Sequence, residues 1–565
     1  MAAAETKPTS SGSWRQSAAV VMAMSLMFCL VGGVLLVAHA LHEQRVRPVD
    51  HAALTVLQEA AARNPRDEAL KTAYRELDTR VRFEAARSRA FRNRGVLVLG
   101  GGLLLLILSA TAWMQGAPPA LRLPGSLPDE AAERAARRLG VLAGTVALLV
   151  FAGALLWPER QKSSAKAEPA AEPPSYADAV GQWPAFRGMG ARGVGDATMT
   201  PPLTWDGKEG TNVVWKVRPP RPGFSSPILW DDSLFLTSGD KQSRDLYCYD
   251  AGTGDLRWTV HANDILGSPE QLPKVNDDTG YAASTPTTDG IRVYAIFATG
   301  DVVAVDFAGQ RVWARNLGPA DNPYGHASSL VVHRGRLLIQ YDHFGPSRLI
   351  ALDAATGDTV WEQEREVGAC WATPVLATVG GRTEVYLNAE PFVMAFDAET
   401  GERLWRNECM GGEVGPSPAY FDGLAFFTTD YATLAAIHTG GGEQAGVIAW
   451  QTDEELPDVS SPVAADGLLF VATSASAVSC YDARTGELCW RELFDEGFYA
   501  SPVVVGNRVY VTDFKGRTQV FAVAREYQSL AVNELGEPAM GTLAFRGNRA
   551  YLRGSRYLYC LAEVP

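Results

Sequence analysis

One stretch of sequence decides the fold: Asp353-Ala354-Ala355-Thr356-Gly357-Asp358-Thr359-Val360-Trp361. Two close copies follow it along the chain, from Asp397 to Trp405 and from Asp482 to Trp490. In each copy an Asp precedes a Thr-Gly pair, and a Trp stands four residues after the Gly. An Asp carboxylate accepts hydrogen bonds from the N–H groups of its own turn, and Gly readily adopts φ > 0. The stretch therefore predicts a tight hairpin between two β-strands.

The same pattern recurs in weaker copies on both sides. The Gly/Trp pairs are Gly254/Trp258, Gly309/Trp313, Gly357/Trp361, Gly401/Trp405, Gly446/Trp450 and Gly486/Trp490. The turn carboxylates are Asp250, Asp306, Asp353, Asp397 and Asp482. Because each Trp stands at a fixed offset on the second strand, we expect its large apolar ring to wedge between neighbouring repeat units.

A second repeated motif is a Ser or Thr followed by Pro. It occurs at Ser226-Pro227, Thr285-Pro286, Thr373-Pro374, Ser417-Pro418, Ser461-Pro462 and Ser501-Pro502, with degenerate copies at Ser329-Leu330 and Thr542-Leu543. The intervals between copies are 59, 44, 44, 44, 44, 40 and 41 residues. Short apolar runs separated by turns follow each copy, which is typical of antiparallel strands. One four-stranded unit cannot bury both of its faces, so the units are expected to stack around an axis as a β-propeller.

The number of blades follows from the two ends of the repeat region. Seven complete units run from about residue 225 to 535, but the last segment, 541–561, offers only three strands. The missing outer strand stands far upstream as Asn212-Val213-Val214-Trp215-Lys216-Val217. Pairing this strand with the C-terminal strands would close the ring and cover an exposed edge. The sequence therefore predicts an all-β, eight-bladed propeller of four-stranded antiparallel blades over residues 183–565.

The region before the propeller has a different composition. Three apolar runs at about 18–41, 95–114 and 139–157 contain no Asp, Glu, Lys or Arg, and each is long enough to cross the ~30 Å hydrocarbon core as a helix. Residues 1–166 are thus predicted to be a membrane region with three transmembrane helices and a helical loop over 43–94. The first run also suits a cleaved signal peptide, because Ala38-His39-Ala40 resembles a cleavage site. A Pro/Ala-rich tether is predicted over 158–182.

The two regions carry opposite charge. Residues 1–166 hold 21 Lys+Arg against 13 Asp+Glu, a net of +8, which leaves 30 against 51, a net of −21, for 167–565. An acidic propeller would repel phosphate backbones, so we expect no nucleic-acid partner.

The Asp-x-x-Thr-Gly-x-x-x-Trp pattern resembles the repeat of the PQQ-type, quinoprotein-like β-propeller family, over about two thirds of the chain. The resemblance implies one of two classes. Quinoprotein dehydrogenases hold PQQ with Ca²⁺ on the propeller axis, use an Asp base and often carry a disulfide between adjacent cysteines. The other class resembles the propeller lipoprotein of outer-membrane β-barrel assembly, which binds protein and no cofactor. Trp183-Pro184-Ala185-Phe186-Arg187-Gly188 also resembles a motif of membrane-attached members, expected to form a strap against the propeller end.

The remaining motifs favour the second class. The cysteines stand at 29, 248, 370, 409, 480, 489 and 560, with no two adjacent and no Cys-x-x-Cys spacing for zinc, although a disulfide between Cys370 and Cys409 stays open. Gly-x-Ser-x-Gly, His-Glu-x-x-His and phosphate-loop motifs are absent from the sequence. Asp277-Asp278, in the first long insertion, suits either a cation site or a solvated loop.

We therefore expect a non-catalytic scaffold that binds proteins or peptides, with no catalytic residue, metal site or cofactor. The alternative is a membrane quinoprotein dehydrogenase that oxidises a sugar or alcohol with PQQ and Ca²⁺. Candidate binding residues stand just before the Ser/Thr-Pro motifs, where the innermost strands surround the mouth of the central channel: Phe224, Tyr281, His326, Trp371 and Tyr499. Aromatic rings there could either hold an extended peptide or fill the channel.

Location and topology are in conflict. Similar propellers work outside the cytoplasm, which predicts a multi-pass protein of a bacterial inner or cytoplasmic membrane with a periplasmic propeller. However, loop 43–94 holds 12 Lys+Arg, and the positive-inside rule would keep that loop and the propeller in the cytoplasm. We follow the family and expect the propeller outside.

Overall fold

The computed structural model of the chain describes residues 26, 29, 106–107, 110 and 179–563. By contacts the chain divides into two compact units, Met1–Lys166 and Ala167–Pro565. Apart from residues 26, 29, 106–107 and 110, the three predicted membrane spans fall outside the described residues, as do loop 43–94 and nearly all of the tether, and all of these stay predictions. Within the described residues, no helix is both long and apolar enough to cross a membrane.

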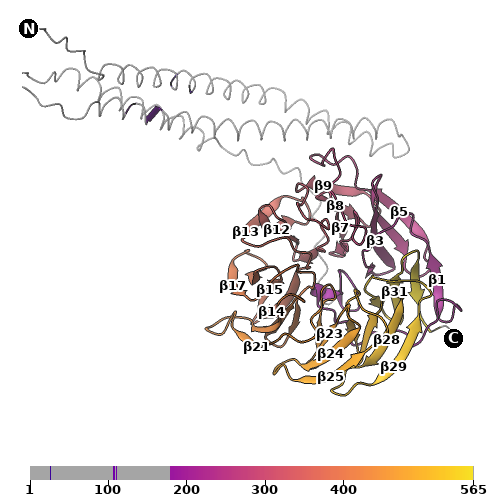
Figure 1. Ribbon diagram of the computed structural model, residues 1–565. Helices are drawn as coiled ribbons and strands as arrows, with labels where there is room; N and C mark the ends of the chain where they lie inside the picture. The colour runs from indigo at the N-terminus through magenta and orange to yellow at the C-terminus, as the bar shows by residue number, and fades with distance from the viewer. Residues whose placement is uncertain (1–25, 27–28, 30–105, 108–109, 111–178, 564–565) are drawn as a thin grey trace, which may run out of the picture. The chain divides into compact units, whose positions relative to one another are not determined.

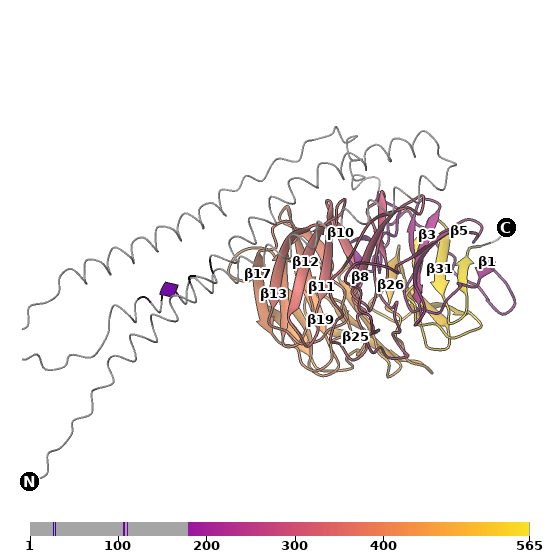
Figure 2. The same ribbon diagram turned by 90° about the horizontal axis from the view of Figure 1, so that it is seen from above.

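Eight four-stranded antiparallel sheets form the second unit, and they follow one another around a ring (Figure 1). In Figure 2 the ring is seen edge-on, and its strands run across its thickness. We number the blades one to eight in the chain order of their innermost strands. This architecture confirms the predicted all-β, eight-bladed propeller. The strands are short because each spans only the thickness of the ring.

Within each blade the strands follow chain order from the innermost to the outermost, except that β1 completes blade eight. Blades one to four consist of β2 (Ile228–Trp230), β3 (Ser233–Gly239), β4 (Arg244–Asp250), β5 (Leu256–His261); β6 (Thr287–Thr288), β7 (Arg292–Ile296), β8 (Asp301–Asp306), β9 (Arg311–Asn316); β10 (Val331–His333), β11 (Arg336–Tyr341), β12 (Ser347–Asp353), β13 (Thr359–Arg365); β14 (Val375–Val379), β15 (Arg382–Leu387), β16 (Phe392–Asp397) and β17 (Arg403–Glu408). Blades five to eight consist of β18 (Ala419–Phe421), β19 (Leu424–Thr428), β20 (Leu434–His438), β21 (Ile448–Thr452); β22 (Val463–Ala465), β23 (Leu468–Ala472), β24 (Ala477–Asp482), β25 (Leu488–Leu493); β26 (Val503–Val505), β27 (Arg508–Thr512), β28 (Arg517–Ala522), β29 (Ser529–Glu534); β30 (Ala544–Arg546), β31 (Arg549–Arg553), β32 (Leu558–Leu561) and β1 (Val213–Val217).

The eighth blade joins the two ends of the propeller sequence. β1 pairs antiparallel with β32, with Trp215 opposite Cys560 and Val217 opposite Leu558. In Figure 1 the magenta β1 accordingly lies beside the yellow C-terminal blade. The predicted closure by the upstream strand is therefore confirmed, and it gives the eighth blade its fourth strand.

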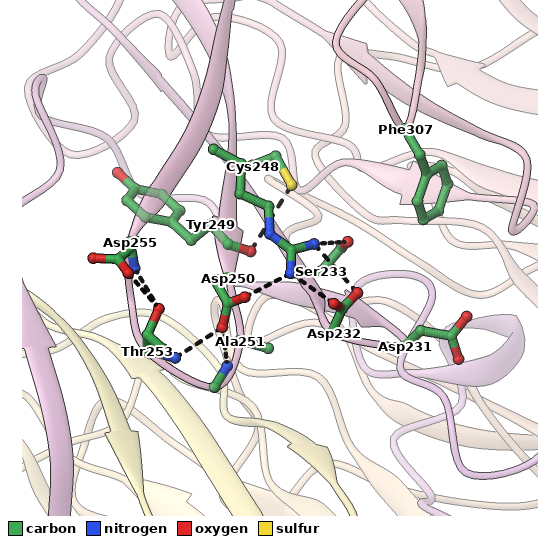
Figure 3. Close-up of polar contacts among 12 residues, drawn as sticks. Asp231, Asp232, Ser233, Cys248, Tyr249, Asp250, Ala251, Thr253, Asp255 and Phe307 are labelled. Carbon is green, nitrogen blue, oxygen red and sulfur yellow. Dashed lines mark hydrogen bonds and ion pairs between the residues drawn. The ribbon is translucent and has the colours of Figure 1, made fainter.

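The repeated turn joins the two outer strands of a blade. In blade one, Asp250 Oδ1 accepts the backbone N–H groups of Gly252 (2.8 Å) and Thr253 (2.9 Å), as Figure 3 shows. Asp353, Asp397 and Asp482 accept two turn N–H groups in the same way. The turn is thus held by its own carboxylate, which leaves its Gly free to face the neighbouring blade.

Each repeat Trp docks against the next blade. Its indole N–H donates to a backbone carbonyl of that blade in the pairs Trp215–Ala251, Trp258–Phe307, Trp313–Ala354, Trp361–Glu399, Trp450–Ala483 and Trp490–Ala524, at 3.0–3.1 Å. In the first five of these pairs the ring also lies on the Gly of the neighbouring turn, where a Cβ at Gly401 would stand 2.6 Å from the ring of Trp361. The Trp405 ring lies on Gly446 in the same way, but its indole nitrogen has no acceptor among the described residues. The Gly/Trp pair is therefore a contact between blades.

Blade seven has no Trp on its outer strand, and an upstream segment takes that position. Trp205 is buried in the cluster that joins blades seven and eight, which includes Val520 and Tyr559. Its backbone N–H donates to Asn533 Oδ1 of β29 at 2.8 Å. We infer that Trp205 supplies the apolar wedge that this blade lacks.

Candidate binding site in the central channel

The Ser/Thr residues of the repeated motif form a closed ring around the axis. In each pair of neighbouring blades, the backbone N–H of one residue donates to the side-chain oxygen of the next, at 2.9–3.1 Å. The ring consists of Ser226, Thr285, Ser329, Thr373, Ser417, Ser461, Ser501 and Thr542. All eight residues are buried. The hydroxyl group is therefore needed at this position because it satisfies a backbone donor of the preceding blade.

An N-terminal strap, residues 183–200, closes the channel on the side of the first hairpin turns. Trp183 exchanges two backbone hydrogen bonds with Leu229 of blade one, at 2.8 and 3.1 Å. Further along the strap, Gly195 N–H donates to Val504 of blade seven at 2.8 Å, and Thr200 N–H donates to Gly547 of blade eight at 2.9 Å. The short 3₁₀ helix η1 (Met189–Ala191) packs on β10 and β14, near the centre of the ring.

Arg187 is the buried centre of the strap. Its side chain is fully buried and donates to the carbonyl oxygens of Pro418 (3.3 Å) and Pro462, which belong to blades five and six. None of its hydrogen-bond acceptors is a carboxylate, and burial lowers the pKa of its guanidinium to about 9. The strap thus contacts the blades on every side of the axis and seals one end of the channel.

The open end of the channel is a cup of about 370 Å³. Phe186 of the strap reaches into it, and the Ser/Thr ring forms its lower wall. The upper wall is formed by the residue two positions before each ring residue: Phe224, Ala283, Ala327, Trp371, Gly415, Val459, Tyr499 and Met540. Positions two apart in extended backbone point to the same side, so both rings face the axis.

Three of the five predicted site residues therefore line the cup, and two do not. Phe224, Trp371 and Tyr499 stand at the inward-facing position. Tyr281 and His326 stand four and three residues before their ring residue; their side chains are 8% and 1% exposed and are not among the lining residues. The His326 ring packs 5.0 Å from that of Tyr341, and burial lowers the pKa of His326 to about 4.

Sequence reasoning missed most of the rim of the cup. Its residues come from five loops and are Asp278, Thr279, Tyr324, Glu413, Asp430, Tyr431 and Asp458. Tyr324 donates to Glu413 Oε2 at 3.0 Å, and its ring lies edge-on to Trp371 at 5.0 Å. The one available indication was the 59-residue interval after Ser226, whose extra length carries Asp278 over the cup.

The cup is negatively charged. Its lining includes Asp278, Glu413, Asp430 and Asp458 but no Lys, Arg or His. Burial and the nearby charge of Asp458 raise the pKa of Asp430, and burial together with Asp458 and Asp278 raises the pKa of Tyr499. The hydrogen bond to Glu413 raises the pKa of Tyr324. All three shifts have the sign expected of an unneutralised negative field.

The lining residues do not fit PQQ with Ca²⁺. PQQ is a tricarboxylate, and the cup offers no cationic side chain to receive it. The described residues also contain no group of three or more His, Cys, Asp or Glu placed to hold a metal ion. All cysteines of the described part, including Cys370 and Cys409, are free thiols. The carboxylates of the rim are thus spread around the mouth and are not gathered as ligands.

The fold and the site together define an eight-bladed propeller with a strap-sealed axial cup. Residues 197–344, 345–460 and 441–552 match the family described as "Outer membrane protein assembly factor BamB". These matches span more than half of the chain, and the chain belongs to this PQQ-type repeat family.

Individual relatives include both assembly-factor propellers and quinoprotein dehydrogenases. The outer membrane protein assembly factor BamB of Yersinia pestis is 24% identical over 253 residues, which are 41% of this chain and 62% of that protein. The quinohemoprotein alcohol dehydrogenase of Comamonas testosteroni is 32% identical over 157 residues, 25% of this chain and 22% of that protein. The chain thus covers less than two thirds of the length of these relatives.

The chain is also similar to solved structures. The quinohemoprotein alcohol dehydrogenase ADHIIG of Pseudomonas putida HK5 has a TM-score of 0.51 at 13% identity, covering 68% of this chain and 81% of that protein. BamB of Moraxella catarrhalis has a TM-score of 0.47 at 15% identity, covering 62% of this chain and 99% of that protein. At such low identity the likeness to the dehydrogenase shows the propeller fold alone.

Proposed function

We propose that the protein is a membrane-anchored, non-catalytic scaffold whose propeller binds a protein or peptide segment outside the cytoplasm. The observation that carries the proposal is the chemistry of the cup, which is aromatic and acidic, is closed below by the strap and lacks the cationic groups that PQQ needs. Membership of a family described by an assembly factor supports the scaffold class. The three uncharged apolar runs before residue 158 support membrane anchoring. The resemblance to propellers that work outside the cytoplasm supports the proposed location.

Site-specific photocrosslinking tests where the partner binds. A photoreactive phenylalanine analogue replaces Tyr431, whose side chain is 67% exposed on the rim of the cup. The matched control carries it at Phe344, which is 68% exposed but lies outside the cup lining. In native membranes we expect a discrete polypeptide adduct from position 431 and not from position 344. Adducts of equal yield from both positions, or none from either, would contradict a partner at the cup.

The alternative, a PQQ-dependent dehydrogenase, predicts a different result. Trp371 lies in the wall of the cup, so a stoichiometric cofactor there would quench its fluorescence. We expect titration with PQQ and Ca²⁺ to leave the Trp fluorescence unchanged. We also expect no dye reduction when sugars or alcohols are then added. Stoichiometric quenching with substrate-dependent dye reduction would replace the scaffold by the dehydrogenase.

A further inference from the structure

We propose that the group received by the cup is a cationic side chain, a lysine ammonium or an arginine guanidinium, presented by the bound peptide. The inference rests on the proposed scaffold function and specifies the chemistry of the segment that it binds.

The first argument is the state of the carboxylates around the cup. Asp278 comes from the insertion between β5 and β6, Asp430 from the β19–β20 turn and Asp458 from the loop before β22, so separate loops converge on one cavity. Asp458 lines the cup, and its buried Oδ1 has no hydrogen-bond partner among the described residues. A carboxylate with neither a donor nor a positive charge beside it is costly, and a cationic group in the cup would offset its charge.

Some carboxylates elsewhere on the propeller are paired with an arginine. Asp482 pairs with Arg525 at 2.6 Å, and Asp513 pairs with Arg517 at 2.9 Å. The lining of the cup contains no such arginine, although other turns of the propeller have one. The negative charge of the cup is thus not neutralised by its own lining, and a ligand can supply the positive charge.

The second argument is the set of aromatic rings that accompanies the carboxylates. The cup is lined by Phe224, Tyr324, Trp371, Tyr431 and Tyr499. Electron-rich ring faces attract ammonium and guanidinium groups by about 0.5–2 kcal/mol each, most strongly where water is excluded. Hydrated metal ions gain less from such rings than organic cations do, so rings and carboxylates together favour a side chain over an inorganic ion.

The third argument is the shape of the site. The strap, with Phe186 in the cup and Arg187 below it, prevents a chain from threading the propeller. The volume of about 370 Å³ lies near the lower end of the range of small-ligand pockets, about 300–1,000 Å³. The cup thus has room for one or two side chains, while the peptide backbone stays at the mouth.

Calorimetry on the full-length protein in detergent tests the proposal with defined probes. These are N-acetylated trilysine amide and triarginine amide, with triglutamate amide, spermidine and CaCl₂ as comparison ligands. We expect the two basic peptides to bind and triglutamate not to bind. The variant Asp430→Asn/Asp458→Asn is expected to weaken the basic peptides about tenfold or more. The control Asp277→Asn, one residue from Asp278 but outside the lining, is expected to leave their affinity unchanged.

Several results would overturn the inference: equal binding of triglutamate, retention of full affinity in the double variant, or binding of spermidine or Ca²⁺ without binding of either basic peptide. Thermal denaturation checks that the variants are folded. The two proposals fail separately. A polypeptide adduct at position 431 that persists in the double variant would contradict the cationic ligand but not the scaffold function. Binding of trilysine without any polypeptide adduct would contradict the scaffold function but not the preference of the cup for a cation.

Discussion

The backbone N–H of Thr542 donates a hydrogen bond of 3.0 Å to Oγ of Ser226, across 316 positions of sequence. This bond is the last of the eight that encircle the axis, and it joins blade eight to blade one. The pairing of β1 with β32 joins the same blade at its outer edge. The propeller is therefore closed at both its inner and outer radius by segments from opposite ends of the repeat region.

Removal of this closing acceptor should destabilise the whole ring. Ser226→Ala leaves the buried N–H of Thr542 without a partner, so we expect the free energy of unfolding to fall by about 1–3 kcal/mol. Ser529→Ala, at an exposed position of β29, is the control and should stay within about 0.5 kcal/mol of the parent protein. Urea denaturation measures both. Equal stability of the two variants would show that the ring bond contributes nothing to closure.

The docking of a repeat Trp on the Gly of the next blade can be separated from backbone strain. Gly401 (φ 75°) and Gly335 (φ 74°) have nearly the same positive φ, so the strain that positive φ imposes on Ala is similar at both. A Cβ at 401 would stand 2.6 Å from the Trp361 ring, whereas a Cβ at 335 meets nothing within 4 Å. We expect Gly401→Ala to be less stable than Gly335→Ala by about 1–3 kcal/mol in chemical denaturation. A smaller loss at 401 than at 335 would argue against Trp docking as a stabilising contact.

The strap should depend on Arg187. Arg187→Met removes the donors to the carbonyls of Pro418 and Pro462, and the free energy of strap opening should fall by about 1–3 kcal/mol. Opening governs cleavage of the segment when reclosing is fast, so thermolysin should cut within 183–200 about 5- to 150-fold faster. Arg218→Met, at an exposed position, is the matched control. An unchanged cleavage rate in Arg187→Met would mean that the other contacts of the strap are enough to keep it closed.

The propeller and its closure were predictable from sequence because both follow from local rules repeated at a nearly constant interval. A turn carboxylate, a left-handed Gly and a docked Trp recur in most of the blades and impose the same geometry there, and a three-stranded remainder requires a fourth strand. The inward-facing position was equally periodic, since the ring residue and the residue two before it both line the cup. Choosing that position consistently, rather than the nearest aromatic residue, would have excluded Tyr281 and His326.

The rim and the strap could not be predicted in the same way. Asp430, Tyr431 and Asp458 lie on loops that differ from blade to blade, and their convergence depends on the angular position of each blade around the axis. Arg187 gave no indication of its burial, because an arginine satisfied by backbone carbonyls needs no acidic partner in the sequence. Such contacts are fixed only when distant blades are brought together.

The acid limit of stability can be assigned in part to the turn of blade six. Asp482 lies beside Arg525, whose hydrogen bond to the carboxylate lowers the pKa of Asp482 to about 2. Its folded pKa is thus below the unfolded value of about 3.9, so the contribution to stability is present above pH ~4 and is lost as pH falls through about 2. Carbon-13 NMR of the Asp482 carboxyl should show the low titration midpoint, and Arg525→Gln should move that midpoint upward. Asp482→Asn should lower stability at pH 5 but have little effect near pH 2. A midpoint that stays low without Arg525 would assign the shift to the turn N–H groups of Arg484 and Thr485 instead.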